Sequence, residues 1–452
     1  MVDILPFKGL RYNSKKTGDY SKLLAPPYDI IDESQKIFLK NLSPYNIVNL
    51  TLPDDIGEKS RYENARDILS AWIAGDVLQF DSEESIYIFR ENFTENGAVK
   101  SFMGFAALLK IEEYGKGKVL RHEKTLPKPR EDRLNLLTAC RANLEFILTI
   151  FNDDDKKVTG ILNSFMQQVP EVTACAMYDD SICFNLWSIK NMKEIENIIR
   201  IMKDRTVLIA DGHHRYETSR LYRERTLMPA GKPKNDIISG CKGAGNNTCR
   251  AASEDYILCL FVAGNQKEIS IHPTHRLIRF SGRITAGDII NKLGTCFNIE
   301  KIKNKEELID AKMKQSRISG KKSICVLFKD SGCYYAELKT DLPDIYRQLN
   351  IPAQPFIAEF EYLDVNILHK LILSELLREN EIEEIRFLHT IKEVKQQLSG
   401  TDKVSDFDAA FILNAPEIKT VESLSGSGLI MPQKSTYFYP KPCSGMVMYK
   451  FE

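Results

Sequence analysis

The sequence has no surplus of charge, no long apolar run and no secretion signal. Its 62 basic residues balance 62 acidic residues over 452 positions. This balance disfavours a dedicated nucleic-acid-binding protein, because such proteins usually carry a basic surplus. No stretch approaches the length of a membrane helix, and the amino terminus lacks the pattern of a signal peptide. We therefore expect a cytoplasmic protein without membrane or nucleic-acid partners.

The sequence also lacks a regular cysteine pattern. Its 10 cysteines are scattered and form no CxxC pair. This spacing offers neither a zinc site nor a disulfide framework. Several cysteines stand among apolar neighbours, so we expect reduced and mostly buried thiols.

What the sequence does contain is a succession of strand-like and helix-like segments, which predicts an α+β fold. The chain is longer than one compact domain, and 43% of its residues are hydrophobic, enough for a large core. We predict an N-terminal α/β region at residues 1–118, a catalytic core at residues 119–228 and a C-terminal α+β region at residues 229–452. Residues 229–250 are rich in Gly, Lys and Asn, which indicates a mobile loop.

The most informative segment is residues 207–216, Val-Leu-Ile-Ala-Asp-Gly-His-His-Arg-Tyr. Its apolar half predicts a buried strand, and Asp211-Gly212 predicts a tight turn into a helix that begins at Tyr216. Amide groups in the first turn of a helix and the helix dipole both favour a bound anion, so phosphate is the expected ligand. The alternative is an ordinary turn in which Asp211 only caps the helix.

A second dense group of charges occupies residues 120–133, where His122 and Glu123 stand among several basic side chains. A carboxylate among cations stays ionised at neutral pH and can accept a hydroxyl proton, while the cations neutralise phosphoryl oxygens. Prolines at positions 127 and 129 stiffen the segment. A solvated loop is the alternative interpretation.

Three further segments offer polar groups to a cleft. Residues 23–31 contain two prolines that present Tyr28 and Asp29 on a stiff loop. Residues 271–277 contain two histidines but no third zinc ligand at a recognisable spacing, so we favour a polar strand end over a metal site. Residues 428–442 place a lysine before two hydroxyls, which suits phosphate without forming a P-loop. A closing aromatic strand is an equal alternative for this last segment.

Asp-Gly-His-His-Arg at residues 211–215 is similar to the signature loop of the ParB/sulfiredoxin-like superfamily. Sulfiredoxin has a cysteine where this chain has His213, so thiol-based reduction is not implied. With four other segments, the loop resembles the pyrophosphate-dependent free serine kinases, a family formerly known as a domain of unknown function. These segments are Ala25–Asp29, Arg121–Thr125 with Asp132-Arg133, Pro273–Arg276 and Met431–Lys441.

The resemblance implies a ParB/sulfiredoxin-like core with additional mixed α/β regions. It implies transfer of a phosphoryl group from pyrophosphate to the hydroxyl of L-serine, with Mg²⁺ as cofactor and ADP or ATP as alternative donors. The products would be O-phosphoserine and phosphate, which connects the chain to serine metabolism and cysteine biosynthesis. Other hydroxyl substrates, such as homoserine or threonine, stay open.

The resemblance also implies roles for individual residues. Glu123 is the expected general base, and Asp211 either binds Mg²⁺ or orients that base. The expected catalytic residues are Glu123, Asp211 and His214. The expected phosphate-binding residues are Gly212, His213, Arg215, Arg121, Lys124, Arg133, Lys434, Ser435 and Thr436. The expected substrate-binding residues are Tyr28, Asp29, His122, Thr125, His275 and Arg276.

Two other classes of protein stay open at this point. A ParB-like nucleotide-binding or DNA-associated protein shares the loop, but it needs a helix-turn-helix region and a basic surplus, which the sequence does not display. A non-catalytic anion-binding protein also shares the loop, but it has no need of Glu123 beside the cations.

Overall fold

The computed structural model describes residues 1–451 except residues 96, 126, 228–252, 283, 353–354, 378–381 and 400–406. The loop predicted at residues 229–250 lies outside the described residues. The chain divides into two compact units, unit 1 with residues 1–121, 125–269 and 440–452, and unit 2 with residues 122–124 and 270–439. This division differs from the three regions expected above, because residues 1–118 and 119–228 contribute strands to one sheet.

Unit 1 is built on a nine-stranded sheet with the order β6-β11-β8-β12-β5-β4-β10-β9, in which β1 also pairs with β5. Every residue of β8 and β12 is buried, so both faces are covered at the centre of the sheet. The strands are β1 (Ile4–Leu5), β4 (Ile86–Glu95), β5 (Ala98–Lys110), β6 (Val119–Leu120), β8 (Ile147–Phe151), β9 (Val172–Cys175), β10 (Cys183–Ile189), β11 (Val207–Asp211) and β12 (Tyr256–Ala263).

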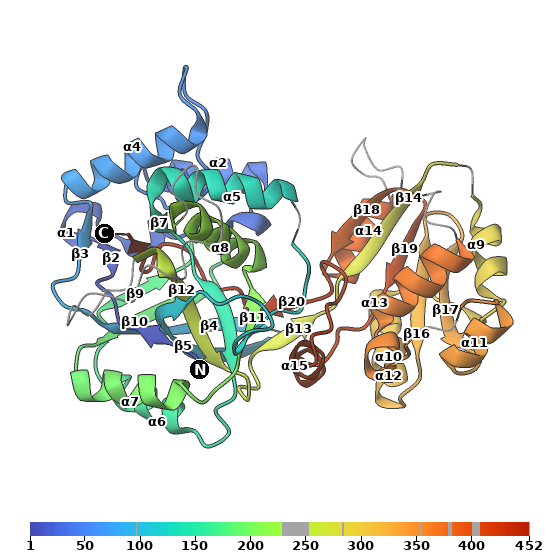
Figure 1. Cartoon of the computed structure of the whole chain (residues 1–452). Coiled ribbons are helices and arrows are strands. Elements are labelled where there is room, and N and C mark those ends of the chain that lie inside the picture. The colour runs from blue at the N-terminus through green and yellow to red at the C-terminus, as the bar shows by residue number, and fades with distance from the viewer. Residues whose placement is uncertain are drawn as a thin grey trace. The chain divides into compact units, whose positions relative to one another are not determined.

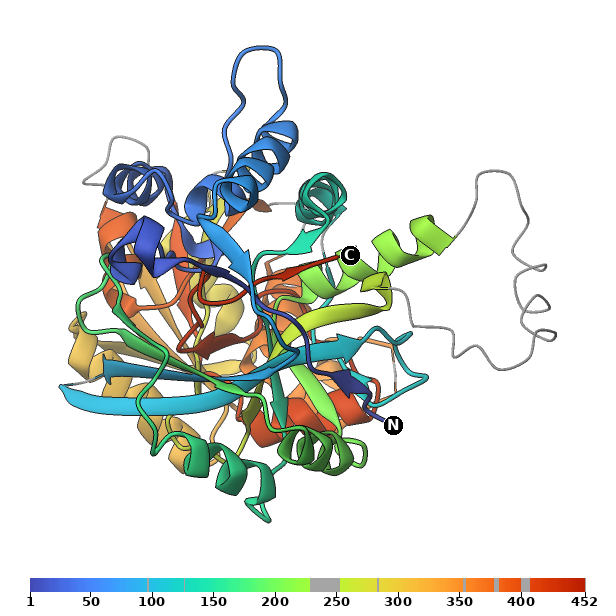
Figure 2. The ribbon, with the colours of Figure 1, turned by 90° about the vertical axis from the view of Figure 1, so that its left-hand side faces the viewer.

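Helices lie on both faces of this sheet (Figures 1 and 2). One face carries α4 (Arg61–Ala74), α5 (Pro127–Cys140) and α8 (His213–Leu227), and the other carries α6 (Lys157–Phe165) and α7 (Met192–Met202). Helix α7 packs on the core because its apolar residues recur at helical spacing, and Ile195, Ile198 and Met202 are fully buried.

Smaller elements complete unit 1. The short strands pair as β2 with β3 and as β7 with β21, so the last residues of the chain join this unit. These elements are β2 (Leu10–Tyr12), β3 (Leu78–Phe80), β7 (Ala142–Asn143), β21 (Tyr449–Lys450), α1 (Ser14–Thr17), α2 (Glu33–Leu42), α3 (Val48–Thr51), and 3-10 turns at Tyr20–Lys22, Tyr28–Ile30 and Ser253–Asp255.

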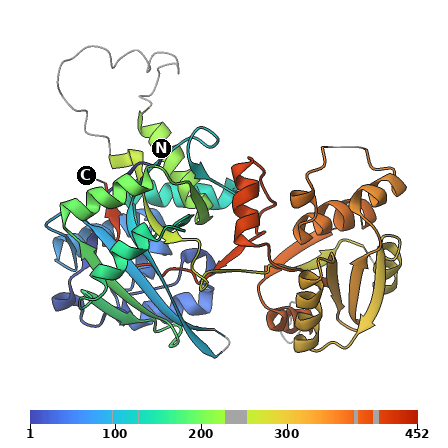
Figure 3. The same ribbon diagram turned by 90° about the horizontal axis from the view of Figure 1, so that it is seen from below.

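Unit 2 is built on a six-stranded antiparallel sheet with the order β15-β17-β16-β19-β14-β18. All of β16 is buried, and the helices of the unit surround the strands (Figure 3). A separate pair joins β13 (Ser270–His272) to β20 (Tyr437–Tyr439). The strands of the main sheet are β14 (His275–Phe280), β15 (Phe297–Ile302), β16 (Ser323–Phe328), β17 (Gly332–Leu338), β18 (Ile382–Leu388) and β19 (Ala409–Ile412).

The helices of unit 2 include α10 and α14, whose apolar residues pack in one core with the sheet. They are α9 (Ala286–Leu293), α10 (Glu306–Ile318), α11 (Leu342–Gln348), α12 (Ala358–Glu361), α13 (Asp364–Asn366), the π-helix η5 (Ile367–Leu376), α14 (Ile391–Ser399) and α15 (Ile418–Gly426). Together the two units confirm the α+β class, whereas the ParB/sulfiredoxin-like core stays a prediction.

The expectation that residues 120–133 form a stiff loop is wrong. Helix α5 begins at Pro127, because proline is favoured in the first turn of a helix, where its missing N–H costs nothing. Asp132 and Arg133 therefore lie on a helix. The strand before this helix, β6, covers only Val119 and Leu120, and the helix expected from Tyr216 begins earlier, at His213.

The expectation of reduced thiols throughout is also wrong, because Cys175 and Cys183 form a disulfide. The two residues face each other in the antiparallel pair of β9 and β10, which brings their side chains within bonding reach. The other described cysteines are free and buried, as expected. Among the residues that the structure describes, no helix is long and apolar enough to cross a membrane.

Candidate functional site

Strand β11 ends irregularly, directly before the turn that leads into α8. The register between β11 and β8 shifts between Ile209 and Asp211, and such an irregularity redirects the side chain beside it. Gly212 has a φ of 92°, a left-handed conformation that glycine adopts without a Cβ clash. Its carbonyl accepts a 3.0 Å hydrogen bond from the amide of Tyr216, which opens α8. His213, His214 and Arg215 therefore form the first turn of that helix, where amides lack intrahelical acceptors.

Two cations hold the carboxylate of Asp211. Arg215 Nη2 donates to its Oδ2 at 2.8 Å, and Lys441 Nζ forms an ion pair with its Oδ1. Arg215 also donates to the carbonyl of Phe146. Burial lowers the pKa of Arg215, but the carboxylates of Glu145 and Asp211 outweigh that effect, so its pKa is raised and the group stays charged. The turn is thus a rigid, charged structure in a mostly buried place.

Glu145 connects this turn to the loop of Tyr28. Its Oε1 accepts hydrogen bonds from the amide of Tyr28 and from the hydroxyl of Ser444, both at 3.0 Å. The Tyr28 ring lies 4.1 Å from the guanidinium carbon of Arg133. Burial raises the pKa of Tyr28, so its phenol stays protonated at neutral pH. Asp29 is exposed beside it.

Several of the basic residues expected to bind phosphate have protein partners. Arg133 donates to Asp132 at 2.5 and 2.8 Å and to the carbonyl of Thr51 at 2.8 Å, and only 6% of it is exposed. Arg121 stacks over the Tyr114 ring at 4.2 Å. Lys124 is exposed and Thr125 is half-buried. A phosphate-binding role for these residues stays a prediction.

A magnesium ion at Asp211 does not fit this arrangement well. Its two carboxylate oxygens already contact the cations Lys441 and Arg215, so a metal ion has to displace one of them. Carboxylates that hold Mg²⁺ usually face water and substrate phosphates instead. The predicted metal-binding role of Asp211 stays a prediction, and no step below depends on it.

In unit 2, the Glu123 carboxylate is held by backbone amides. Lys434 N donates to Oε2 at 3.2 Å, while Ser435 N and Thr436 N donate to Oε1 at 2.9 and 3.1 Å. The Thr436 hydroxyl adds a fourth bond at 3.1 Å. Lys434 has a φ of 56°, and a left-handed residue of this kind lets successive amides converge on one anion. The segment predicted to bind phosphate therefore holds a carboxylate of the chain itself.

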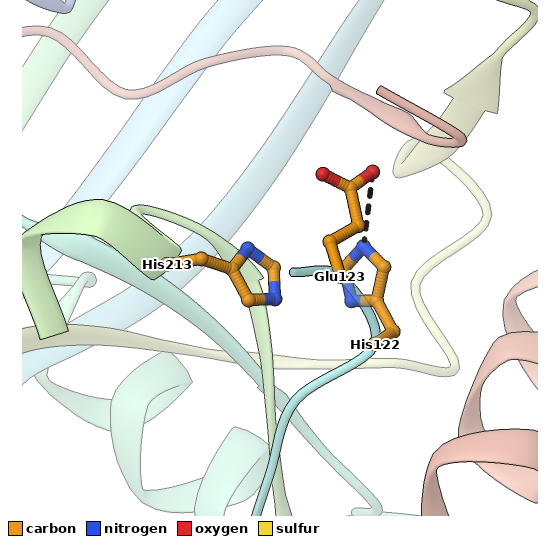
Figure 4. A group of neighbouring side chains, drawn as sticks. All are labelled: His122, Glu123 and His213. Carbon is orange, nitrogen blue, oxygen red and sulfur yellow. Dashed lines mark ion pairs between the residues drawn. The ribbon is translucent and has the colours of Figure 1, made fainter. Parts of the chain in front are cut away.

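His122 lies beside this carboxylate. Its Nε2 is 2.6 Å from the Thr436 hydroxyl and 3.8 Å from Glu123 Oε1, and the dashed line in Figure 4 marks the longer distance. Figure 4 also shows the His213 side chain at the start of its helix. Only 1% of His122 is exposed, so its imidazole has a fixed position next to Glu123.

On strand β14, Arg276 contacts the segment that holds Glu123, and His275 contacts residue Leu413 instead. Arg276 donates to the carbonyl of Lys434 at 3.0 Å and to the carbonyl of Thr274. His275 Nδ1 accepts a 3.3 Å bond from the amide of Leu413. Burial, followed by the nearby charges of Arg276 and His389, lowers the pKa of His275 to about 3, so its ring is neutral at pH 7.

The predicted site residues thus gather in two groups. Unit 1 brings together Tyr28, Asp29, Arg133 and the turn 211–215, and unit 2 brings together His122, Glu123, Arg276 and residues 434–436. The sequence analysis assigned no role to Glu145 or Lys441. An acid directly before an apolar strand, as at Glu145, is a local signal of a buried carboxylate that needs hydrogen-bond partners. Lys441 carries no such signal.

Comparisons with known proteins identify a family but no characterised relative. The family described as "Protein of unknown function (DUF1015)" matches residues 4–366. No curated protein matches the sequence. A mutant free serine kinase in complex with AMP has 12% identity and a TM-score of 0.36, covering 74% of this chain and 88% of its own.

Two further solved structures are similarly distant. A conserved hypothetical protein from Pyrococcus furiosus has 12% identity and a TM-score of 0.32, covering 72% of this chain and 88% of its own. SbnI with a C-terminal truncation from Staphylococcus aureus has 11% identity and a TM-score of 0.33, covering 76% and 86%. Scores this low match no residue of those proteins to a residue of this chain.

Proposed function

The chain belongs to the DUF1015 family of proteins of unknown function, and we propose that it is a phosphotransferase that moves a phosphoryl group from pyrophosphate to free L-serine. The turn at residues 211–215 carries the proposal. It joins a buried strand to the first turn of α8, and it places histidine and arginine side chains there. Helix amides, the helix dipole and cations at one point favour a phosphate ligand.

In the proposed reaction, the hydroxyl oxygen of serine attacks one phosphorus of pyrophosphate. The bond from that phosphorus to the bridging oxygen breaks, orthophosphate leaves with the electron pair, and the hydroxyl proton passes to a carboxylate. Such reactions need positioning and charge neutralisation more than covalent chemistry. We assign the phosphates of the donor to Gly212, His213, His214 and Arg215 in unit 1.

We assign the general base to Glu123 in unit 2. Its Oε1 accepts three hydrogen bonds, whereas Oε2 accepts one, from Lys434 N at 3.2 Å. Oε2 is therefore the oxygen with room for a proton. A base must lie within hydrogen-bond reach of the proton that it removes, so the proposal requires serine to bind at Oε2. His122 then fixes the orientation of the carboxylate.

The test is to incubate the full chain with L-serine, Mg²⁺ and each of pyrophosphate, ADP and ATP, and to follow O-phosphoserine by ³¹P NMR. We expect product with pyrophosphate. If product forms only with ADP or ATP, the proposed donor is wrong, but the proposed serine kinase activity is supported. Absence of product with every donor, together with absence of serine binding, would refute the kinase. Parallel reactions with homoserine and threonine define the hydroxyl substrate.

A further inference from the structure

Unit 2 contains a cavity of about 440 Å³ at one edge of its sheet. The cavity lies next to Leu413 and Asn414, which follow β19, next to Arg276 near the beginning of β14, and next to Lys322, which precedes β16. Both β14 and β16 pair with β19 in antiparallel register, so these strand ends meet at the same edge (Figure 1). Cavities of roughly 300–1,000 Å³ commonly bind small molecules.

A buried cation lines the inner part of this cavity. Only 1% of Arg276 is exposed, and its hydrogen bonds go to the carbonyls of Thr274 and Lys434. Within the described residues, no carboxylate lies within 4.0 Å of its guanidinium. Burial lowers the pKa of Arg276 to about 10, and the nearby Glu123 raises it, so the side chain is still charged at neutral pH. A buried charge without an ion-pair partner costs free energy that an anionic ligand would recover.

Hydroxyl groups accompany Arg276 in the cavity wall. The Thr274 hydroxyl is buried and has no hydrogen-bond partner among the residues that the structure describes. Ser435 also lines the cavity, next to the loop that holds Glu123. A guanidinium with neighbouring hydroxyls matches the oxygens of a phosphate group.

The outer wall adds a second cation without an ion pair. Lys322 is half-buried and lies 5.9 Å from the Tyr362 ring, and no carboxylate of the described chain pairs with it. The other basic side chains in the wall are compensated, because Arg317 pairs with Glu417 at 3.1 Å and Lys321 with Glu337 at 2.8 Å. Arg276 and Lys322 are therefore the two cations of this wall without an ion pair to a described carboxylate.

Acidic groups also line the wall. Burial raises the pKa of Asp364, whereas its hydrogen bonds to Asn414 and the charges of Lys322 and Arg317 lower it. Asp364 Oδ2 accepts bonds from the amide and the side chain of Asn414 at 2.8 and 3.0 Å. Glu359 accepts a 3.0 Å bond from the Ser423 hydroxyl. Leu363, Val365, Leu413 and Pro416 supply apolar wall around them. The cavity thus offers a cationic inner end and room for an organic group.

We propose that this cavity binds an organic phosphate monoester, with the phosphate at Arg276, Thr274 and Lys322 and the organic group against the apolar wall. A phosphate monoester carries close to two negative charges at neutral pH, and its oxygens would give Arg276 the anionic partner that it lacks among the described residues. The inference goes beyond the proposed kinase activity, since it concerns equilibrium binding in the absence of serine and pyrophosphate.

The test is isothermal titration calorimetry on the full chain with AMP, O-phosphoserine and inorganic phosphate. We expect one organic phosphate to bind at one site and inorganic phosphate to bind at least about tenfold more weakly, because it leaves the apolar wall empty. Lys322→Ala should weaken binding by about tenfold or more, as expected for loss of a charged hydrogen bond. Lys314→Ala removes an exposed lysine of α10 that pairs with Asp310, and it should leave the affinity unchanged.

Arg276→Gln is the second variant and should abolish detectable binding. If this buried substitution prevents folding, Lys322→Ala still decides the question, because the Lys322 side chain is half-buried and pairs with no carboxylate of the described residues. Absence of binding for both organic phosphates at millimolar concentration would overturn the proposal. Binding that Lys322→Ala leaves at wild-type strength would overturn it as well.

Discussion

The ammonium group of Lys441 binds the carboxylate of Asp211, although 230 positions separate the two residues in the sequence. Only 7% of the Lys441 side chain and 16% of the Asp211 side chain are exposed. The pair is therefore largely shielded from water, where ion pairs are stronger but each charge is costly to leave alone. The end of the chain thereby stabilises the turn that carries the proposed function.

Replacing Lys441 should therefore lower the free energy of unfolding of the protein. Lys441→Met removes one cation from Asp211 and keeps its ion pair with Arg215, and breaking a buried pair by removing one partner costs about 3 kcal/mol. We expect the free energy of unfolding, measured with urea, to fall by that amount. Lys110→Met is the matched control, because the exposed ion pair of Lys110 with Asp3 is worth less than about 1 kcal/mol. Equal losses in the two variants would contradict this view of the turn.

Gly212→Ala should strain the same turn. Gly212 has a φ of 92°, and an added Cβ would lie 3.2 Å from the guanidinium of Arg215. A left-handed conformation costs a residue with a Cβ about 1–2 kcal/mol. Gly160→Ala is the control, because Gly160 lies within α6 and a Cβ there meets nothing within 4 Å. That change should stabilise the protein by up to about 1 kcal/mol. Opposite shifts in thermal unfolding are the expected result.

Glu123→Gln tests the proposed base. The amide keeps the shape of the carboxylate but cannot take the serine proton, so we expect turnover to fall by about 10²–10⁴-fold. The measurement is the initial rate of O-phosphoserine formation with the donor that supports activity. Glu131→Gln removes an exposed acid of the same charged segment and should leave the rate unchanged. Full activity of Glu123→Gln would show that Glu123 is not the general base. It would not contradict the proposed phosphotransferase activity.

The stability of the protein should fall in acid because of two buried histidines. Burial lowers the pKa of His275 to about 3 and that of His369 to about 4, from an ordinary value of 6.5. The unfolded chain therefore binds protons below pH 6.5 that the folded chain does not bind until about pH 4 or lower. Stability is complete above that range and is lost across it as pH falls, by about 1.4 kcal/mol per pH unit for each histidine.

Urea unfolding at several pH values measures this slope. His275→Gln removes one titrating group while keeping an acceptor for the amide of Leu413, so the slope should become shallower. A slope between pH 6.5 and 4 that the substitution leaves unchanged would show that other groups control acid unfolding.

The disulfide between Cys175 and Cys183 should stabilise unit 1. The bond closes a loop with a sequence separation of 8, for which restriction of the unfolded chain contributes about 2–3 kcal/mol. Cys175→Ser with Cys183→Ser should lower the unfolding free energy by that amount. Alkylation followed by peptide mass spectrometry provides a direct check, because peptides with these cysteines should be labelled only after reduction. Labelling before reduction would contradict the bond.

Local patterns in the sequence predicted many of the strands and helices. Helical spacing indicated α4, and two strand-like runs with a turn between them indicated β4 and β5, whereas α7 was not predicted. The beginning of α5 was missed because prolines at 127 and 129 suggested a loop, whereas proline in a first turn is compatible with a helix. The disulfide was missed because Cys175 and Cys183 belong to two strands whose pairing the sequence did not reveal.

The candidate site could be predicted only in part, because several of its contacts join residues that are remote in sequence. Asp211 and Gly212 were found because an apolar strand ends there, a signal contained in a few neighbouring residues. The partners of Asp211 and Glu123 come from residues 434–441, which are remote in sequence and become neighbours only through folding. The sequence suggested a phosphate ligand for residues 434–436, and in the structure these residues bind the carboxylate of Glu123.

The membership of residues 440–452 in unit 1 has a consequence for how the protein is made. Strand β21 pairs with β7, and Lys441 completes the ion pairs of Asp211. A ribosome must therefore synthesise all of unit 2 before unit 1 receives strand β21 and this lysine. Until then, the nascent chain carries β7 without its partner strand and Asp211 without one of its cations. The proposed donor site can thus be completed only after unit 2 has been synthesised.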